Sequence, residues 1–114
     1  MLRTFIEVPL FTKRWHELGL GDEALRELQN TLLRDPEIGV MMQGPGGIRK
    51  IRIAFNHRGK SGSARACYVD FAEYDTIYLI TVFAKKEQDN LTDHEKSVLK
   101  ELVKNMKDEA RRRR

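Results

Sequence analysis

The sequence predicts an α+β domain, in which a small and mostly antiparallel sheet is covered by helices. Strand-like and helix-like periodicities follow one another in the order strand, two helices, three strands, helix. The links between the last three strands are short, which favours an antiparallel meander. The 114 residues leave room for a single domain, expected over residues 1–110, followed by a basic tail at 111–114.

The N-terminal part is expected to form a strand and a helical hairpin. Residues 4–8 are rich in β-forming side chains, and Pro9 suits the first turn of a helix. Asp22 is the expected N-cap of the second helix, and Pro36 ends it because the residue before proline avoids helical dihedrals. Each helix has one apolar stripe that needs a sheet to cover, made of Phe11, Trp15 and Leu18 in the first and Leu25, Leu28 and Leu32 in the second.

Three strands are expected next, over residues 48–55, 65–71 and 77–84, with a polar connection at 56–63. The first alternates, which predicts a half-buried strand with a basic outer face. Its inner face would carry Ile51, Ile53 and Phe55, and its outer face Lys50, Arg52 and Ala54. The last is almost continuously apolar, which is typical of a strand covered on both faces.

The C-terminal helix is expected to begin with a capping box, in which Thr92 caps the helix and Glu95 occupies its third position. Its apolar stripe would consist of Val98, Leu99, Leu102, Val103 and Met106. The arginine tail is expected to fray.

Composition excludes several classes of protein. The single cysteine, Cys67, allows no intrachain disulfide and no zinc site built from cysteines. No apolar run is long enough to cross a membrane, and the N-terminus does not resemble a signal peptide. We therefore expect a cytoplasmic protein with no membrane partner.

The net charge of +4 is concentrated in one segment. Residues 38–69 contain six cationic side chains and no acid, whereas the other 82 residues carry 15 basic and 17 acidic groups. A local field of one sign favours a polyanionic partner, with nucleic acid as the first candidate. A solvated basic face paired with acids from elsewhere in the chain is the other reading.

Such a cluster could cleave RNA without a metal or other cofactor. Attack by the 2′-hydroxyl needs a base, charge stabilisation on the phosphorane oxygens and an acid for the leaving 5′-oxygen. Arginines supply the second, and a lysine crowded by cations releases its proton more easily and could supply the first. The usual acid–base residues of a free-standing ribonuclease are missing, apart from His57, so the RNA would have to be positioned by another molecule.

Three segments resemble the RelE/HigB superfamily of bacterial toxins, and its HigB-like branch in particular. They are residues 46–52 (Gly-Gly-Ile-Arg-Lys-Ile-Arg), 61–65 (Ser-Gly-Ser-Ala-Arg) and 79–87. The resemblance implies the RelE-like fold and an mRNA endoribonuclease, or mRNA interferase, that acts in the ribosomal A site. It also implies a cognate antitoxin, commonly a helix-turn-helix protein.

The matching motifs suggest roles for individual residues. Lys50 and Arg52 match the basic strand pair of the family, Arg65 its phosphate-binding arginine, and Lys85 or Lys86 the basic residue after the last strand. We expect Lys50 as the general base, Arg65 with Arg52 as stabilisers of the transition state, and Lys86 or Lys85 at the leaving group. The remaining cations would hold RNA phosphates: Arg49, Arg58 and Lys60.

One departure from the family leaves the acid and base assignments open. Some relatives carry a catalytic tyrosine shortly after the last strand, whereas residues 88–92 contain none. Two alternatives use the same scaffold without catalysis. One is a ParE-like inhibitor of DNA gyrase, and the other is a plain RNA-binding module.

Overall fold

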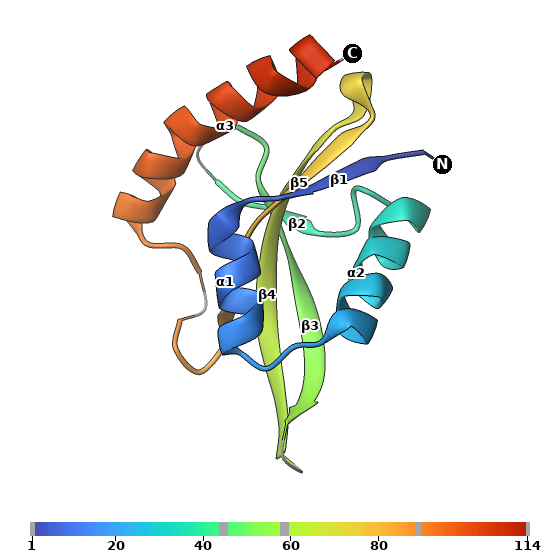
Figure 1. The fold of residues 1–114 in the computed structure, drawn as a ribbon. Helices are drawn as coiled ribbons and strands as arrows, with labels where there is room; N and C mark the ends of the chain where they lie inside the picture. Colours follow the sequence, from blue (N-terminus) through green and yellow to red (C-terminus); the bar gives the residue numbers. More distant parts are fainter. Residues whose placement is uncertain (1, 44–45, 58–59, 89, 114) are drawn as a thin grey trace.

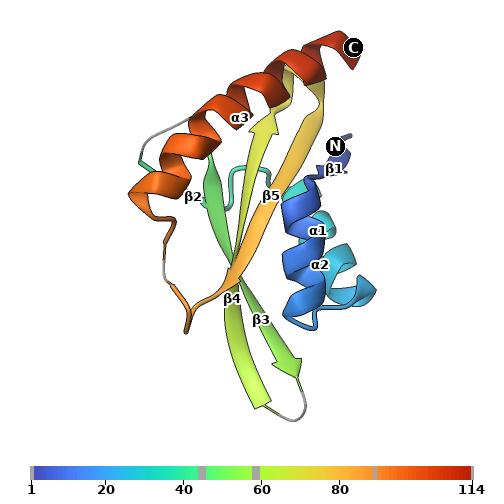
Figure 2. The ribbon, with the colours of Figure 1, turned by 60° about the vertical axis from the view of Figure 1, so that its left-hand side comes forward.

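The structure, a computed structural model, describes residues 2–43, 46–57, 60–88 and 90–113, and only the backbone at 55–57 and 60–61. Its sheet lies between two helical layers (Figures 1 and 2), with the first two helices on one face and the last on the other. The elements are β1 (Thr4–Glu7), α1 (Pro9–Glu17), α2 (Asp22–Arg34), β2 (Val40–Met41), β3 (Arg49–His57), β4 (Lys60–Phe71), the 3-10 turn η1 (Ala72–Tyr74), β5 (Thr76–Ala84) and α3 (Asp93–Arg113).

The five strands lie in the order β1-β5-β4-β3-β2. The predicted antiparallel meander of β3, β4 and β5 is confirmed, and β1 adds a parallel strand beside β5. The edge strand β2 was not predicted, because two residues are too few to show a period. Its Val40 pairs with Lys50 at the margin of the sheet.

Two cores fill the spaces on either side of the sheet. Every residue of β5 is buried, as expected of a strand covered on both faces. The core under α1 and α2 includes Phe11, Trp15, Leu28, Leu32, Ala64, Ala66 and Tyr68. The core under α3 includes Leu99, Val103, Met106, Cys67, Val69 and Ile80.

The β3–β4 hairpin is longer than predicted. Residues 56–63 were expected as a connection, but β3 continues to His57 and β4 begins at Lys60. The ladder includes the pair Phe55↔Gly62. Backbone hydrogen bonds build a ladder without apolar side chains, so a polar hairpin end gives no periodic signal. The hairpin extends past the helices that cover the rest of the sheet (Figure 1).

Two of the expectations for helix ends, the cap at Asp22 and the fraying of the tail, need correction. Gly21, not Asp22, is the N-cap of α2, and Asp22 is its first residue, where a negative charge still favours the helix dipole. The capping box of α3 is confirmed: the Glu95 carboxylate accepts from Thr92 N at 2.8 Å, and Glu95 N donates to Thr92 Oγ1 at 3.1 Å.

The C-terminal arginines continue α3 to Arg113 instead of fraying. Arg113 forms an ion pair with Glu109 at 2.9 Å, and Arg111 with Asp108 at 3.1 Å. Pairs at these helical spacings add a few tenths of a kcal/mol each. Val98 was wrongly assigned to the apolar stripe, since it is 55% exposed, and Ala110 belongs to the buried face in its place.

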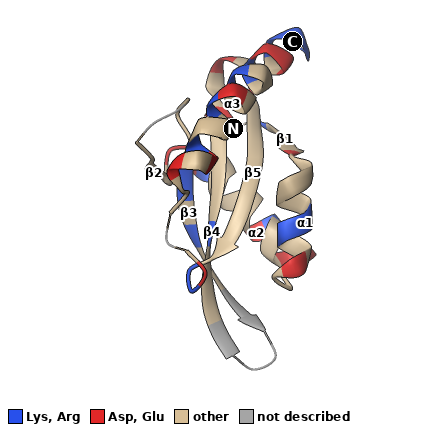
Figure 3. Ribbon diagram, turned by 90° about the vertical axis from the view of Figure 1, so that its left-hand side faces the viewer, with Lys and Arg blue, Asp and Glu red and all other residues tan. Residues whose placement is uncertain are grey.

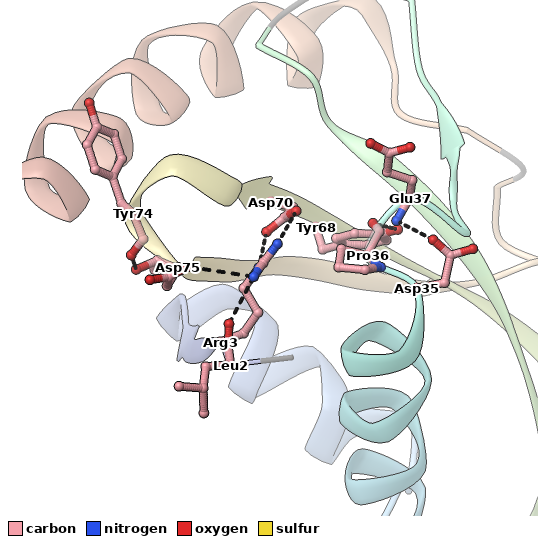
Figure 4. A network of polar contacts seen from close by, with 10 residues as sticks. Leu2, Arg3, Asp35, Pro36, Glu37, Tyr68, Asp70, Tyr74 and Asp75 are labelled. Carbon is pink, nitrogen blue, oxygen red and sulfur yellow. Dashed lines mark hydrogen bonds and ion pairs between the residues drawn. The ribbon is translucent and has the colours of Figure 1, made fainter.

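A buried ion pair fastens the start of the chain to the end of β4 (Figure 4). Arg3 Nε donates to Asp70 Oδ1 at 2.8 Å and its Nη2 to Oδ2 at 3.3 Å, while Asp75 Oδ1 lies 3.7 Å from Nη1. The hydrogen bond to Asp70 is the main cause that raises the pKa of Arg3. The contacts of Arg3 with Asp70 and Asp75 hold the start of β1 beside the turn between β4 and β5.

Candidate catalytic and RNA-binding site

The strand register brings three of the predicted site residues together. We call Lys50, Arg52 and Arg65 the cation cluster. Arg52 pairs directly with Arg65 across the β3–β4 ladder, and Lys50 pairs with Cys67 one step further along. Because alternate residues of a strand share a face, Arg65 lies on the same face as Cys67 and Val69, which pack under α3. The cluster therefore occupies the face of the sheet that α3 covers in part, and the ribbon of Figure 3 shows basic positions along β3 and β4.

The cluster is accessible where α3 leaves the face uncovered. Arg52 is exposed, whereas Lys50 and Arg65 are half-buried. The guanidinium of Arg65 donates to the carbonyl of Ala64 at 3.3 Å, which orients it along its own strand. Like charges directly opposite each other destabilise a sheet pair, so Arg52 and Arg65 together favour an anion between them. Ile51 and Ile53 of the predicted inner face pack on the core under α1 and α2, and the side chain of Phe55 lies outside the described residues.

Burial and two charges act on Cys67, beneath the cluster. Burial is the main cause that raises the pKa of its thiol to about 12, while Lys50 lowers it and Glu95 raises it. The first turns of α3 pack over the strands that carry the cluster, since Leu99 shares a core with Cys67. The hydrogen bond from Thr92 N lowers the pKa of Glu95, which is therefore ionised at neutral pH.

Glu95 is a neighbour of the site that sequence reasoning missed. In the sequence, the capping box alone accounts for a glutamate at this position, so no further role was expected. Its approach to a strand 28 residues earlier follows from the packing of α3, and no local spacing signals it.

Lys85 and Lys86 follow β5 at the end of the ladder that carries Arg65. Both are exposed, and Ala84 pairs with Ala64 immediately before them. Lys85 N donates to Ser63 O at 3.0 Å, which fixes the turn against β4. Glu87 holds the same turn, since its carboxylate accepts from Ala84 N at 3.2 Å and from Arg14 at 2.8 Å.

The three residues expected to hold phosphates are not gathered in the same way. Arg49 has the opposite strand parity to Lys50, and its Nη1 donates to the carbonyls of Glu37 at 3.0 Å and Gly39 at 2.8 Å. Arg58 lies outside the described residues. Lys60 is the first residue of β4, and its side chain is outside the description.

A buried hydroxyl holds the segment before β2 against the strands of the site (Figure 4). Tyr68 Oη donates to Pro36 O at 2.8 Å and accepts from Gly39 N at 2.9 Å. A Cβ on Gly39 would lie 2.8 Å from that hydroxyl and 2.9 Å from Lys50 O. Only glycine therefore lets the backbone come this close to the strand that carries Lys50 and Arg52.

The loop before β3 is pressed against α3 by a second glycine. Gly46 has a φ of 63°, in the left-handed region that favours glycine, and a Cβ there would lie 2.4 Å from Val103 Cγ1. This contact fixes α3 relative to the strand that begins at Arg49.

The described residues contain neither a membrane-spanning helix nor a group of metal ligands. No described helix combines the length and apolarity needed to cross a membrane. In the same part of the chain, no three His, Cys, Asp or Glu side chains gather where they could hold a metal ion.

Comparisons with known proteins agree with this architecture. The family model described as the RelE toxin of the RelE/RelB toxin–antitoxin system matches residues 11–113, nearly the whole chain. Among solved structures, the chain resembles a double arginine-to-alanine mutant of the E. coli toxin RelE in the free state. The TM-score is 0.54 at 19% identity, with 78% of this chain and 90% of that chain covered, a likeness that concerns the fold. Because this family model matches residues 11–113, the chain belongs to the RelE toxin family of toxin–antitoxin systems.

Proposed function

We propose that this RelE-family toxin is a ribosome-dependent mRNA endoribonuclease of the HigB-like branch. It cuts mRNA in the ribosomal A site, in the cytoplasm, and so inhibits translation. Its cognate antitoxin is a helix-turn-helix protein. The branch is suggested by the Gly-Gly-Ile-Arg-Lys-Ile-Arg motif at residues 46–52.

The observation that carries the proposal is the pairing of Arg52 with Arg65 on the face that also carries Lys50. Two guanidinium groups on facing strand positions suit two oxygens of one phosphate, because guanidinium presents paired donors to an oxyanion. The turn with Lys85 and Lys86 adjoins the same end of the ladder. This arrangement favours charge stabilisation at one phosphodiester over diffuse binding along a strand.

The reaction that suits these residues is transesterification by the neighbouring 2′-hydroxyl. The amine of Lys50 takes the hydroxyl proton while the 2′-oxygen forms a bond to phosphorus. Arg65 and Arg52 stabilise the negative charge on the phosphorane oxygens. The bond to the 5′-oxygen breaks, Lys86 or Lys85 gives that oxygen a proton, and the products are a 2′,3′-cyclic phosphate and a 5′-hydroxyl.

The ribosome supplies what this site lacks. Its lysines are weaker proton-transfer groups at neutral pH than a histidine pair, so the rate depends on holding the 2′-oxygen, phosphorus and 5′-oxygen in line. Positioning of this kind accounts for several kcal/mol of a barrier. We therefore expect cleavage of translated mRNA and little cleavage of free RNA.

Primer extension on a translated reporter mRNA, with and without ribosomes, tests the proposal. Wild-type protein should give discrete cuts only when ribosomes are present. Arg65→Ala should slow cleavage by about 10²–10³, the cost of about 2.7–4 kcal/mol for one lost stabilising donor. Arg26→Ala is the matched control, because Arg26 is an exposed arginine on α2, on the other side of the sheet.

Two outcomes would contradict this assignment. Wild-type rates in Arg65→Ala would remove that residue from the mechanism. Intact mRNA in both conditions, together with altered DNA supercoiling after induction, would replace the nuclease with a ParE-like gyrase inhibitor. Melting temperatures of the variants near that of the wild type separate these effects from unfolding.

A further inference from the structure

The exposed side of α3 carries a regular row of cations that the proposed chemistry does not use. The basic row consists of Lys96, Lys100, Lys104, Lys107 and Arg111. Its spacings of four, four, three and four residues match the 3.6-residue turn of an α-helix, so all five lie on one side of α3. At 1.5 Å per residue the row is about 22 Å long, with one cation for each turn.

The acids of α3 lie off the line of the row, although Asp108 forms an ion pair of 3.1 Å with Arg111 at its end. Between Lys96 and Arg111, the acids of α3 fall at Glu101, Asp108 and Glu109, all off this line of the helix. Like charges at i,i+4 destabilise a helix by about 0.2–0.5 kcal/mol for each pair. A helix that served only to cover the sheet would gain by alternating the signs along this line. The row is therefore a surface on which an external anion would relieve repulsion.

Most cations of the row are available to a ligand. Lys100, Lys104, Lys107 and Arg111 are exposed. Lys107 forms an ion pair with Glu73 at 3.5 Å and Arg111 one with Asp108 at 3.1 Å, and all four side chains of these pairs are at least 42% exposed. Such surface pairs contribute at most about 1 kcal/mol and exchange readily. Within the described part of the chain, Lys100 and Lys104 form no ion pair.

The row borders a groove of about 810 Å³ between α3 and the segment that precedes β3. Lys100, Lys104 and Lys107 form its rim on α3, and Val69, Phe71 and Val103 contribute apolar surface. Four acids also line the groove: Glu37, Asp70, Glu73 and Glu101. Because those acids repel an anion from the interior, and Glu101 lies off the line of the lysines, a polyanion would follow the basic row itself along α3.

The row begins beside the cation cluster. Lys50 pairs with Cys67 across the β3–β4 ladder, and Cys67 packs in one core with Leu99, which lies three residues after Lys96 in α3. From there the row leads away from the cluster along the axis of α3, which crosses the sheet obliquely in Figure 2. An RNA strand whose phosphate occupies the cluster therefore has a second line of positive charge within reach.

We propose that the basic row of α3 is a second RNA-binding surface, which contacts the phosphate backbone of RNA without reading its sequence. Evenly spaced charges without interleaved aromatic side chains suit a repeating phosphodiester, since base recognition needs stacking platforms. The choice of RNA rests on the proposed function. The binding itself requires no cleavage.

Salt dependence of RNA binding tests the row directly. The triple variant Lys100→Gln, Lys104→Gln, Lys107→Gln is compared with Lys13→Gln, Arg26→Gln, Arg34→Gln, which removes the same charge from exposed positions of α1 and α2. Fluorescence anisotropy follows binding to a labelled single-stranded RNA and to a base-paired RNA hairpin. In the row variant, the slope of log K against log salt should become shallower by about 2, at about 0.7 per lost phosphate contact on a single strand.

The two RNA probes separate the sources of the backbone, and both positive results support the proposal. A loss confined to the single strand indicates that the row holds mRNA, and a loss confined to the hairpin indicates folded RNA such as that of the ribosome. Equal losses in the two triple variants would reduce the effect to net charge and overturn the proposal. A row variant that weakens binding to poly-glutamate but leaves RNA binding unchanged would overturn it as well.

The proposed function is scored separately, by cleavage of translated mRNA. A wild-type protein that cuts no mRNA but loses its salt slope in the row variant would refute the nuclease and retain the row. A protein that cuts mRNA on the ribosome, with identical salt slopes in all variants, would support the nuclease and refute the RNA-binding role of the basic row. Circular dichroism of each variant confirms that α3 remains folded.

Discussion

The two ends of β4 place arginines in opposite settings. Near Phe71, Arg3 is held by Asp70 and Asp75, and the side chains of Arg3 and Asp70 are only 8% and 11% exposed. Towards the hairpin, Arg65 instead faces another cation, Arg52. The first arrangement stabilises the fold, because a desolvated charge is matched by two carboxylate oxygens. The second sets two like charges on facing strand positions, which costs stability locally and is relieved by a bound anion.

This contrast gives a physical criterion for a binding surface in a small domain. A cation that serves the fold meets its acid at short range and is shielded from water. A cation that serves a ligand is placed beside cations of its own kind and stays accessible. Cys67 and the α3 core beneath the second group keep its strands rigid while the charges above them remain open.

The largest effect is expected at Cys67, where the sheet under the cluster should be closed to water. Its thiol pKa is raised from 9.0 to about 12, so the thiolate fraction at pH 8 is about a thousandfold lower than in the unfolded chain. Alkylation by iodoacetamide, followed by mass spectrometry, should be slowed by at least that factor in the native protein. Because the native pKa is raised, the protonated thiol makes its full contribution to the free energy of unfolding below pH 9. This contribution is lost as the pH rises towards 12. Equal alkylation rates with and without denaturant would show that water and reagent reach the core beneath the cluster.

Removing the cation at the paired end should be costly. Arg3→Met leaves Asp70 without its main partner and should lower the free energy of unfolding by about 3 kcal/mol, measured by chemical denaturation. Adding Asp70→Leu should recover most of that loss, because an apolar pair needs no charge compensation. RNA binding should keep its salt slope in both variants. A loss below about 0.5 kcal/mol in Arg3→Met would erase the contrast between the two ends.

A smaller effect is expected where α3 begins, beside the cluster. Thr92→Ala removes the hydroxyl that accepts from Glu95 N and should cost about 1 kcal/mol. Thr92→Ser, which keeps the hydroxyl, is the control. Because the pKa of Glu95 is lowered, its share of stability is present above about pH 4.5 and is lost as the pH falls through its native pKa. Thermal melts of both variants at neutral and acidic pH measure this share. Equal melting temperatures of the alanine and serine variants would show that the hydroxyl of residue 92 does not stabilise the helix.

The smallest effect has the opposite sign. Arg52→Gln relieves the repulsion with Arg65 and should raise the free energy of unfolding by about 0.2–1 kcal/mol. Arg26→Gln, on the other side of the sheet, should leave it unchanged within error. Denaturant melts of the two variants decide the matter. A destabilised Arg52→Gln protein would mean that this arginine serves the fold.

Most of the fold follows from local pattern. The meander, the doubly covered β5 and the capping box of α3 were predicted, because each has a period or a cap that nearby residues define. The strand β2 and the length of the β3–β4 hairpin were not, since backbone pairing alone builds them. Asp22 was misjudged as a cap because its residue type suits both the cap and the first turn.

The site divides along the same line. Alternation along β3 placed Lys50 and Arg52 on one face, and the pairing register then added Arg65. Arg49 looked like one more cation of this group, but parity turns it away and two backbone carbonyls hold its guanidinium. Glu95 could not be placed beside the cluster, because the contact depends on how α3 packs over the strands. The basic row was visible in the spacing of the lysines and was overlooked because each looked like an ordinary solvated charge.

The contact between Gly46 and Val103 makes this toxin adjustable by a single methyl group. A Cβ at residue 46 would act as a wedge under the middle of α3, with the added strain of its left-handed backbone. Such a group would push α3 away from the sheet without removing any cation of the cluster or the row. The packing of α3 over the site is therefore set by the absence of one side chain in the loop before β3.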